Sequence, residues 1–390
     1  MTWVALSLTI VSLLIWVVLT FFRGAFWQLR RFDDDVAPVE NLTWWPRVAV
    51  IVPARNEAAT IARAVLSLVQ QEYPGELRVV VVDDHSDDGT VSLAREAAAR
   101  LGASARVEMV QAAALTPGWT GKLWALQQGL EKANAFAPDY LWLTDADIEH
   151  ATDTLRRLVG RAETRRLDLV SLMVLLEANS FPERLLIPAF LYFFLKLYPP
   201  QWIADKNAKT AGAAGGCVLL KPEALERVGG LGAIRGEVID DCALARAVKR
   251  AGGAIWMGLT RKSVSLRAYG SFAEIRDLIA RTAFTQLGYS NLALIGTLLG
   301  MLLTYVVPVV FTFSAQATAS RLGLAAWALM AVTYLPTVRF YRLSPIWAPL
   351  LPLTAVFYSY ATWLSAARYW LGRGGQWKGR AQAPSRETAQ

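Results

Sequence analysis

Two carboxylates separated by a single residue, Asp145 and Asp147, follow an apolar run that begins at Tyr140. Carboxylates with this spacing can both turn toward one edge of a loop. A divalent cation held there would bridge the two phosphates of a nucleotide diphosphate and neutralise the charge that develops when this group leaves. Because Asp is also favoured in turns and at helix caps, the pair alone is a weak signal. Its place beside the clusters described next favours a metal site.

A second acidic pair, Asp83 and Asp84, ends the apolar run LRVVVVDD. Acidic side chains at this place accept hydrogen bonds from a ribose or a base in dinucleotide-binding folds. We assign this role to Asp84 and a supporting structural role to Asp83. An earlier apolar run, RVAVIVP, is followed by Arg55 and Glu57. A carboxylate at Glu57 would also favour the dipole of the helix that follows.

A third acidic pair, Asp240 and Asp241, lies where a loop enters an amphipathic helix in EVIDDCALARAVKRAG. A carboxylate there can take the proton of an acceptor hydroxyl while that hydroxyl attacks an electrophilic carbon. An acidic N-cap is the structural alternative, and both hold if Asp240 caps the helix while Asp241 faces the substrate. Lys122 opens another helix after Gly121, where it either points at a diphosphate or lies in solvent.

A sheet must bring these clusters to one edge, and the sequence between residues 46 and 147 predicts one. Short apolar runs predict strands at 47–53, 77–84 and 106–110 and at the start of YLWLTDAD (140–147), and they alternate with helical patterns at 57–71, 90–101 and 122–135. This alternation predicts an α/β fold with a mostly parallel sheet that is covered on both faces. Ligands of such sheets bind beyond the carboxyl ends of the strands, which is where the polar clusters fall.

Apolar stretches long enough to cross a bilayer flank this domain. The run from Val4 to Phe22 predicts a retained anchor, because no basic region precedes it and no clear cleavage site follows. Arg23 and its basic neighbours then place the next segment in the cytoplasm. Three C-terminal stretches, at 291–313, 322–338 and 346–366, provide two or three further helices. Four crossings would place the basic tail outside, against the positive-inside rule, so the number of crossings stays open.

A shorter apolar and aromatic run, Leu185 to Tyr198, is interrupted by Pro188 and Lys196. It is too short to span a bilayer and predicts one or two helices lying in the membrane interface. A buried core helix is the alternative. Because the run lies next to the predicted site in the sequence, we expect the acceptor to be a lipid.

The composition predicts a polar domain combined with membrane segments. Of 390 residues, 54% are hydrophobic, yet 40 are Lys or Arg and 32 are Asp or Glu, for a net charge of +8. We assign the positive charge to contact with anionic membrane lipids and not to nucleic acid, because no nucleic-acid-binding motif is present. Two cysteines and two histidines exclude a disulfide framework and a Cys/His zinc cluster. Carboxylates must therefore hold any metal, which suits Mg²⁺ or Mn²⁺.

These patterns predict five regions along the chain. They are an N-terminal transmembrane anchor (1–23), a juxtamembrane linker (24–45), an α/β domain (46–289) with an interfacial helix near 183–200, a C-terminal transmembrane region (290–370) and a basic, disordered tail (371–390).

The motifs PARNE, VDDHSDDGT, GKLWAL, DAD and IDD, in this order within about residues 46–290, resemble family 2 glycosyltransferases of the GT-A fold. Each motif is weak, but their combination is specific. With the flanking membrane segments and the stretch PGWTGKLWALQQG, the chain is most similar to the hopene-associated glycosyltransferases of bacterial hopanoid gene clusters. The resemblance implies a multi-pass protein of the bacterial inner membrane, with its catalytic domain facing the cytoplasm.

The resemblance also implies an inverting transfer of a sugar from a nucleotide-diphosphate sugar, a UDP-sugar being the expected donor. The acceptor would be a membrane lipid, with a hopanoid as one candidate. It implies that Asp241 is the general base and that Asp147 ligates the Mg²⁺ or Mn²⁺ ion. The residues expected to bind the nucleotide sugar are Pro53, Ala54, Arg55, Glu57, Asp84, Lys122 and Asp145.

Two features depart from the family pattern. The usual Glu-Asp pair is Asp240-Asp241, which retains the second acid. The Gln/Arg-x-x-Arg-Trp signature of related membrane enzymes is not matched, and Arg281, Phe284 and Gln286 are the residues expected to substitute for it. Since processive polymer synthases hold the chain end with this signature, its absence favours a single transfer.

Two other functions remain as alternatives, namely a processive polysaccharide synthase and a catalytically inactive membrane scaffold. Retention of the acidic clusters argues against the scaffold. A dehydrogenase is excluded because the first predicted strand lacks the G-x-G-x-x-G turn.

Overall fold

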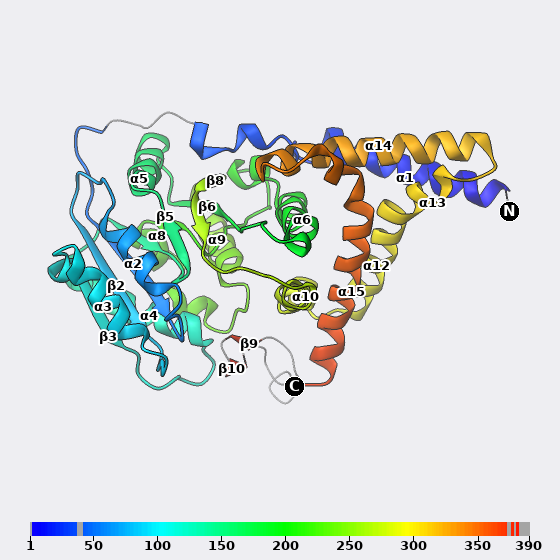
Figure 1. The fold of residues 1–390 in the computed structure, drawn as a ribbon. Helices are drawn as coiled ribbons and strands as arrows, with labels where there is room; N and C mark the ends of the chain where they lie inside the picture. The colour runs from blue at the N-terminus through cyan, green and yellow to red at the C-terminus, as the bar shows by residue number, and fades with distance from the viewer. Residues whose placement is uncertain (1, 37–41, 373–375, 378–379, 382–390) are drawn as a thin grey trace. The chain divides into compact units, whose positions relative to one another are not determined.

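The computed structural model describes residues 2–36, 42–372, 376–377 and 380–381, and its contacts divide the chain into two compact units (Figure 1). The sheet unit comprises Phe32–Glu177, Trp202–Ala268 and Gln376–Gln390. The apolar-helix unit comprises Met1–Arg31, Ala178–Gln201 and Tyr269–Gly375. The domain predicted over 46–289 is therefore interrupted, because its stretches 178–201 and 269–289 belong to the apolar-helix unit.

An eight-stranded sheet forms the centre of the sheet unit, in the order β3-β2-β1-β4-β7-β6-β8-β5. Its strands are β1 (Val48–Ala54), β2 (Leu77–Asp83), β3 (Val107–Gln111), β4 (Tyr140–Leu143), β5 (Ile148–His150), β6 (Leu169–Leu175), β7 (Val218–Leu220) and β8 (Ile255–Ser265). Strands β3, β2, β1 and β4 run parallel to one another, and β6 runs parallel to β8. Strands β5 and β7 are antiparallel to their neighbours. The prediction of a mostly parallel α/β sheet is confirmed.

Helices cover both faces of this sheet (Figure 1). On one face, α2 (Ile61–Val69), α3 (Thr90–Arg100) and α5 (Thr154–Arg165) pack against the alternate side chains of β1 that begin with Val48. On the other face lies α4 (Gly121–Ala133), where a Cβ at Gly129 would come within 2.5 Å of Ile51 Cγ2. The close approach of α4 to β1 therefore requires glycine at this position.

The remaining elements of the sheet unit are short. They are η2 (Asp34–Val36), η3 (Ser104–Arg106), η4 (Asn134–Phe136), α8 (Pro222–Arg227), η5 (Leu231–Ile234), α9 (Asp240–Arg250) and the antiparallel pair β9 (Gln376–Trp377) and β10 (Arg380–Ala381). The amphipathic helix predicted after the third acidic pair is confirmed as α9.

One predicted boundary at the carboxyl edge of the sheet is wrong. The helix predicted over 57–71 begins only at Ile61, because a turn precedes it in which the amides of Thr60 and Ile61 donate to the Glu57 carbonyl oxygen. The strand predicted ahead of Asp145 ends at Leu143, where its pairing with β1 stops. The chain then crosses to β5, which pairs with β8.

The apolar-helix unit is built almost entirely from helices. They are α1 (Thr2–Phe22), η1 (Leu29–Arg31), α6 (Phe181–Leu197), α10 (Phe272–Ala280), α11 (Ala283–Gln286), α12 (Asn291–Met301), the π-turn η6 (Leu302–Val306), α13 (Val307–Thr312), α14 (Ala317–Phe340), η7 (Pro345–Leu350) and α15 (Leu351–Trp370), with α7 (Pro200–Ala204) following α6. Helices α1, α13 and α14 pack against one another (Figure 1).

Three segments of the described chain are long and apolar enough to cross a membrane by length and composition, namely Trp3–Phe22, Asn291–Thr312 and Ala317–Phe340. The stretch predicted over 346–366 forms η7 and α15, and hydroxyl side chains such as Thr354 interrupt its apolar sequence. Two such segments therefore lie in the C-terminal region. The predicted tail, 371–390, lies largely outside the described residues, as do residues 37–41 of the predicted linker.

Helix α6 is one continuous helix that begins with a capping box formed by Ser180 and Glu183. Most of its side chains are buried, and it contacts α10, α14 and α15. The hydroxyl of Tyr358 donates to the Leu186 carbonyl oxygen at 3.0 Å, which ties α15 to α6. The interfacial position that the sequence predicts for this helix stays a prediction.

Candidate active site

Two loops at the carboxyl ends of β1 and β2 are joined by hydrogen bonds. The amide of Asn56 donates to Ser86 Oγ at 3.0 Å, and the amide of Glu57 donates to Thr90 Oγ1 at 2.8 Å. Asn56 also adopts a positive φ of 51°, a conformation that Asn tolerates better than most residues. The polar residues that follow β1 and β2 therefore lie together at one edge of the sheet.

Asp84 lies beneath Arg55 at this edge. The Arg55 guanidinium donates to the backbone oxygen of Asp84 and lies 3.7 Å from its carboxylate, whose side chain is only 2% exposed. The carboxylate of Asp83 accepts from the amide of Ser86 at 3.3 Å, a contact that supports the loop. A ligand that reaches the Asp84 carboxylate must therefore either displace the Arg55 side chain or contact it as well.

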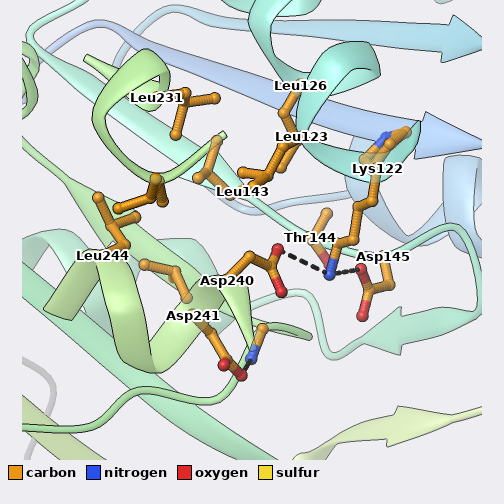
Figure 2. A pocket seen from close by; sticks show the side chains of 14 residues that line it. Lys122, Leu123, Leu126, Leu143, Thr144, Asp145, Leu231, Asp240, Asp241 and Leu244 are labelled. Atoms are coloured by element: carbon orange, nitrogen blue, oxygen red, sulfur yellow. Dashed lines mark hydrogen bonds and ion pairs between the residues drawn. The ribbon is translucent and has the colours of Figure 1, made fainter. Parts of the chain in front are cut away.

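Lys122 lies between two of the acidic clusters (Figure 2). Helix α4 begins beside it, and the Thr120 side chain caps that helix by accepting from the amide of Leu123. The Nζ of Lys122 lies 2.8 Å from Asp145 Oδ1 and 3.5 Å from Asp240 Oδ2. Burial alone would lower the pKa of Lys122, but the two carboxylates raise it well above its ordinary value. Of the two alternatives for this lysine, the solvent-exposed one is wrong.

Asp241 is held at the opening of α9 by two backbone amides. The amide of Gly215 donates to Oδ2 and the amide of Cys242 donates to Oδ1, both at 2.7 Å. Burial, together with the neighbouring charge of Asp240, raises the pKa of Asp241 to about 6, although Lys122 and the two amides favour the charged form. A carboxyl group with this pKa is suited to accept a proton near neutral pH.

Asp240 does not cap α9, so that alternative for the acidic pair is wrong. The N-cap residue is Ile239, and Asp240 is the first residue of the helix, with its carboxylate directed toward Lys122. An acidic residue in the first turn still favours the helix dipole. The ion pair with Lys122, which depends on how α4 and α9 meet, determines the position of this carboxylate.

Asp147 is the residue for which the sequence predicts a metal-binding role. Burial and the charges of Asp145 and Glu57 raise its pKa to about 6, whereas Arg267 and Lys122 oppose this shift. No group of three or more His, Cys, Asp or Glu side chains in the described part of the chain forms a ready-made metal site. Mg²⁺ is commonly held by one or two carboxylates, with substrate phosphates and water as the other ligands. The residues present fit such an ion if the substrate supplies ligands.

The cavity between these groups has largely apolar walls (Figure 2). Besides Pro53, Lys122, Asp145 and the Asp240-Asp241 pair, its lining residues are Leu123, Leu126, Leu143, Thr144, Gly215, Val218, Leu231, Ile234 and Leu244. Apolar walls exclude water and strengthen the electrostatic interactions inside.

Gly215 and Arg267 also belong to the site, although neither was predicted from the sequence. A Cβ at Gly215 would lie 3.3 Å from both Asp241 Oδ2 and Lys122 Nζ, which is tighter than almost all real contacts. Glycine here lets the backbone amide reach the carboxylate. The glycine- and alanine-rich run AGAAGG, residues 211–216, was the available signal for Gly215. Arg267, which follows β8, carried no such signal.

Arg281, Phe284 and Gln286 belong to the apolar-helix unit. Phe284 is buried, and its ring packs against the ring of Tyr369 with centroids 5.5 Å apart. The side-chain oxygen of Gln286 accepts from the hydroxyl of Tyr198 at 2.9 Å. Their predicted role in place of the missing family signature stays a prediction.

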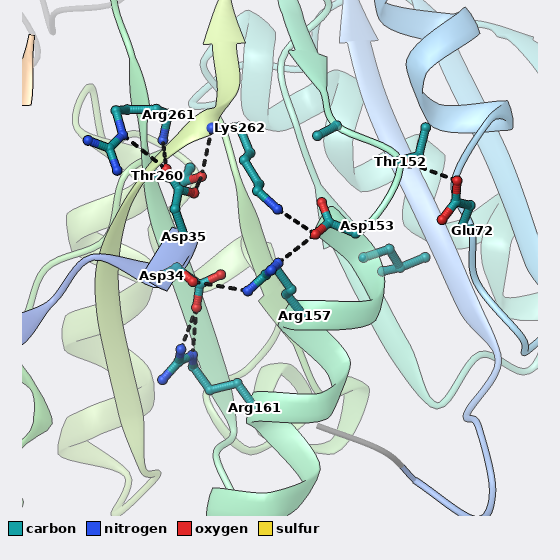
Figure 3. A network of polar contacts seen from close by, with 12 residues as sticks. Asp34, Asp35, Glu72, Thr152, Asp153, Arg157, Arg161, Thr260, Arg261 and Lys262 are labelled. Carbon is teal, nitrogen blue, oxygen red and sulfur yellow. Dashed lines mark hydrogen bonds and ion pairs between the residues drawn. The ribbon is translucent and has the colours of Figure 1, made fainter. Parts of the chain in front are cut away.

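A second network of charged residues in the sheet unit is structural (Figure 3). The Asp34 carboxylate pairs with the guanidinium of Arg161, and Asp35 accepts from the amide of Arg261 at 2.8 Å. Asp153 pairs with Lys262 at 2.6 Å. These contacts attach residues 34–36 to β8 and α5, so this part of the predicted linker is a fixed element of the sheet unit.

Comparisons with known proteins identify the family and the fold of the chain. A family model described as "Glycosyltransferase like family 2" matches residues 46–281. The probable glycosyltransferase YdaM of Bacillus subtilis is 30% identical over 142 residues, which are 34% of this chain and 32% of that protein. Beta-monoglucosyldiacylglycerol synthase of Trichormus variabilis is 32% identical over 115 residues, which are 29% of this chain and 23% of that protein. The matched region therefore spans a third or less of these relatives.

A solved structure resembles nearly the whole chain. The mannosyltransferase PcManGT from Pyrobaculum calidifontis, in complex with GDP-Man and Mn²⁺, superposes with a TM-score of 0.60. The match covers 93% of this chain and 99% of that one at 20% sequence identity. A likeness at this identity establishes a common fold.

Proposed function

Since this chain belongs to the glycosyltransferase-like family 2 and has the GT-A fold, we propose that it transfers a single sugar, with inversion, from a nucleotide-diphosphate sugar to a membrane lipid. Use of a nucleotide sugar follows from the family. The inversion, the lipid acceptor and the roles of individual residues are what we propose.

The observation that carries the proposal is the setting of the Asp241 carboxylate. It lines the cavity that also contains Lys122 and Asp145, and two backbone amides hold it. A carboxylate held in this way keeps its orientation when the acceptor arrives. These contacts support a catalytic base better than a helix cap, because Ile239 already occupies the cap position.

The proposed reaction is one direct displacement. The acceptor hydroxyl oxygen forms a bond to the anomeric carbon while the bond from that carbon to the diphosphate oxygen breaks. The hydroxyl proton passes to Asp241, and the nucleoside diphosphate leaves with the bonding electron pair. Lys122 contributes positive charge beside Asp145, on the acidic edge where the diphosphate would bind.

Asp147 would hold the Mg²⁺ or Mn²⁺ ion, whose chemistry is to neutralise the charge that develops on the departing diphosphate. Arg267, whose charge already acts on Asp147, belongs to the same edge. Asp145 would keep Lys122 in place through their ion pair. Arg55, which lies beside Asp84, would contact the nucleotide.

A lipid acceptor is supported by the apolar-helix unit, which contains three segments of membrane-spanning length. The Trichormus relative is by name a synthase of a glucosyl lipid. A hopanoid is the acceptor we propose to test first, because of the resemblance carried by residues 117–129.

The lipid acceptor is tested by incubating the full-length protein with native membrane lipids and radiolabelled UDP- or GDP-sugars. We expect the label in the organic phase after extraction. Label found only in water-soluble product would contradict the lipid acceptor and leave the family assignment intact.

The pH dependence of transfer should report the pKa of Asp241. Because the base must be deprotonated and its pKa is raised to about 6, kcat/KM should fall about tenfold for each pH unit below that value. The expected profile is level above pH 6. With an unshifted carboxyl pKa, the decline would begin only near pH 4, as expected of an ordinary Asp.

The variant Asp240→Asn separates this effect from the titration of Asp147. It removes the neighbouring negative charge that raises the pKa of Asp241, so the acidic limb should move to lower pH. A limb that stays in place would assign the titration to another group.

A further inference from the structure

We propose that Lys196 and Arg23 form a binding site in the apolar-helix unit for the phosphate headgroup of an anionic membrane lipid. The proposal concerns a ligand other than the sugar donor and acceptor, and it does not depend on the proposed function. Both residues belong to the same compact unit.

Lys196 places an ammonium group among aromatic side chains near the end of α6. Its Nζ donates to the hydroxyl of Tyr305 at 2.7 Å and lies 5.1 Å and 4.9 Å from the ring centroids of Phe193 and Tyr305. An ammonium group has three donors, and Tyr305 accepts one of them. Ring faces attract a cation but do not neutralise it.

The surroundings of Lys196 disfavour its charged form. Burial, and to a lesser degree the charge of Arg23, lowers the pKa of Lys196 to about 8. No carboxylate among the residues that the structure describes opposes this shift. Lys196 is half-buried, and an ammonium group that is partly removed from water without an opposite charge is unfavourable.

The apolar-helix unit contains few acidic residues. Within its described part they are only Glu183, Glu274 and Asp277, and basic residues far outnumber them. The Glu183 carboxylate accepts from backbone amides at the start of α6, and Asp277 pairs with Arg368. We infer that a bound anion supplies the counter-charge for Lys196.

Arg23 joins Lys196 at the end of α6. Its guanidinium donates to the carbonyl oxygens of Lys196 at 3.0 Å and Leu197 at 3.4 Å. A cation at a helix C-terminus is favourable by itself, and this accounts for the position of Arg23. It does not account for the position of the Lys196 side chain, whose ammonium group donates to the Tyr305 hydroxyl.

The apolar surface beside the two cations indicates that the anion belongs to a lipid. Arg23 follows directly on Trp3–Phe22, one of the three segments long enough to cross a membrane. Phe22 is 72% exposed and Leu197 is 48% exposed. A basic residue at the end of a span lies at headgroup depth, where a phosphate can accept charge-assisted hydrogen bonds while its acyl chains cover the apolar side chains.

The test measures lipid binding to the full-length protein in neutral detergent, without sugar donor. Phosphatidylglycerol and phosphatidylcholine with the same acyl chains are titrated, and native mass spectrometry or the shift in Tm reports binding. We expect phosphatidylglycerol to bind more tightly, and Lys196→Met to raise its half-saturation concentration at least about fivefold, the effect of one basic contact.

Lys196→Arg keeps the charge and should bind like the wild type, as should Arg321→Gln, which removes an exposed charge of the same unit. If Lys196→Met does not fold, Arg23→Gln provides the same comparison. Equal binding of the two lipids, or unchanged binding in the charge-removing variants, would overturn the proposal. It would also fail if inorganic phosphate at millimolar concentration reproduced the shift, since the ligand would then be a free anion.

Discussion

Replacing Asp241 with asparagine should reduce sugar transfer by about two to four orders of magnitude, the range that a positioned general base contributes. The loss should fall on kcat, while the affinity for the nucleotide-sugar donor stays within a few-fold of the wild type. The reason is that in the proposed mechanism Asp241 acts on the acceptor hydroxyl, whereas Asp84, Asp147 and Lys122 are assigned to the donor. Transfer is measured with purified full-length protein, and donor binding by calorimetry on the same sample.

Asparagine has nearly the same shape as aspartate but can accept from only one of the amides of Gly215 and Cys242. A small loss of stability is therefore expected and is checked by thermal unfolding. Glu237→Gln is the matched control, because Glu237 is exposed and lies just before α9. Near-normal turnover in Asp241→Asn would rule Asp241 out as the base, whereas loss of both transfer and donor binding would point to a structural role.

Removal of divalent metal should stop transfer, and Asp147→Asn should have a similar effect. A metal ion contributes several kcal/mol to stabilising a developing charge, so a loss of about a thousandfold in kcat/KM is expected at low metal concentration. Mg²⁺ or Mn²⁺ should restore the chelated wild type fully. The variant should need far more metal for partial recovery, because it has lost a carboxylate ligand.

Glu149→Gln is the matched control for Asp147→Asn. Glu149 lies two residues further along, in β5, and its carboxylate faces Arg63, to which it is paired. It should retain normal metal dependence. Full activity of the wild type in excess chelator would contradict the metal-binding role of Asp147. Lys122 and Arg267 would then be the groups that neutralise the negative charge of the diphosphate.

The residues at the ends of β1, β2 and β4 could be predicted because strand and turn patterns are local. Asp84, Asp145 and Asp147 directly follow continuous apolar runs, and parallel strands bring such ends to one edge. The element boundaries there were less predictable. Glu57 lies in a turn because its amide bonds to Thr90 of the neighbouring loop, a contact that helix propensity cannot reveal.

The surroundings of Asp241 could not be predicted for a related reason. Its carboxylate is held by Gly215, twenty-six positions earlier in the chain, and Asp240 pairs with Lys122 on a different helix. Both contacts depend on how α4, α9 and the glycine-rich segment pack together. Sequence spacing identifies the acidic pair but not which of its members faces a cation.

In the apolar part of the chain, the helices could be predicted from the sequence but their packing could not. Hydropathy located Trp3–Phe22 and the C-terminal helices, since length and composition are enough for that purpose. It did not indicate that α6 would be an uninterrupted helix despite Pro188, or that Lys196 would lie among aromatic rings. These features arise from packing within the apolar-helix unit.

The most direct test of the central claim is mass spectrometry of native membrane lipids after incubation with the full-length protein, Mg²⁺ or Mn²⁺ and a panel of nucleotide sugars. We predict one lipid species whose mass rises by a single sugar residue, with the increment lost in Asp241→Asn. A ladder of increments would identify a processive synthase. If no lipid gains mass with any donor while the nucleotide sugar still binds, the proposed transfer to a membrane lipid is wrong.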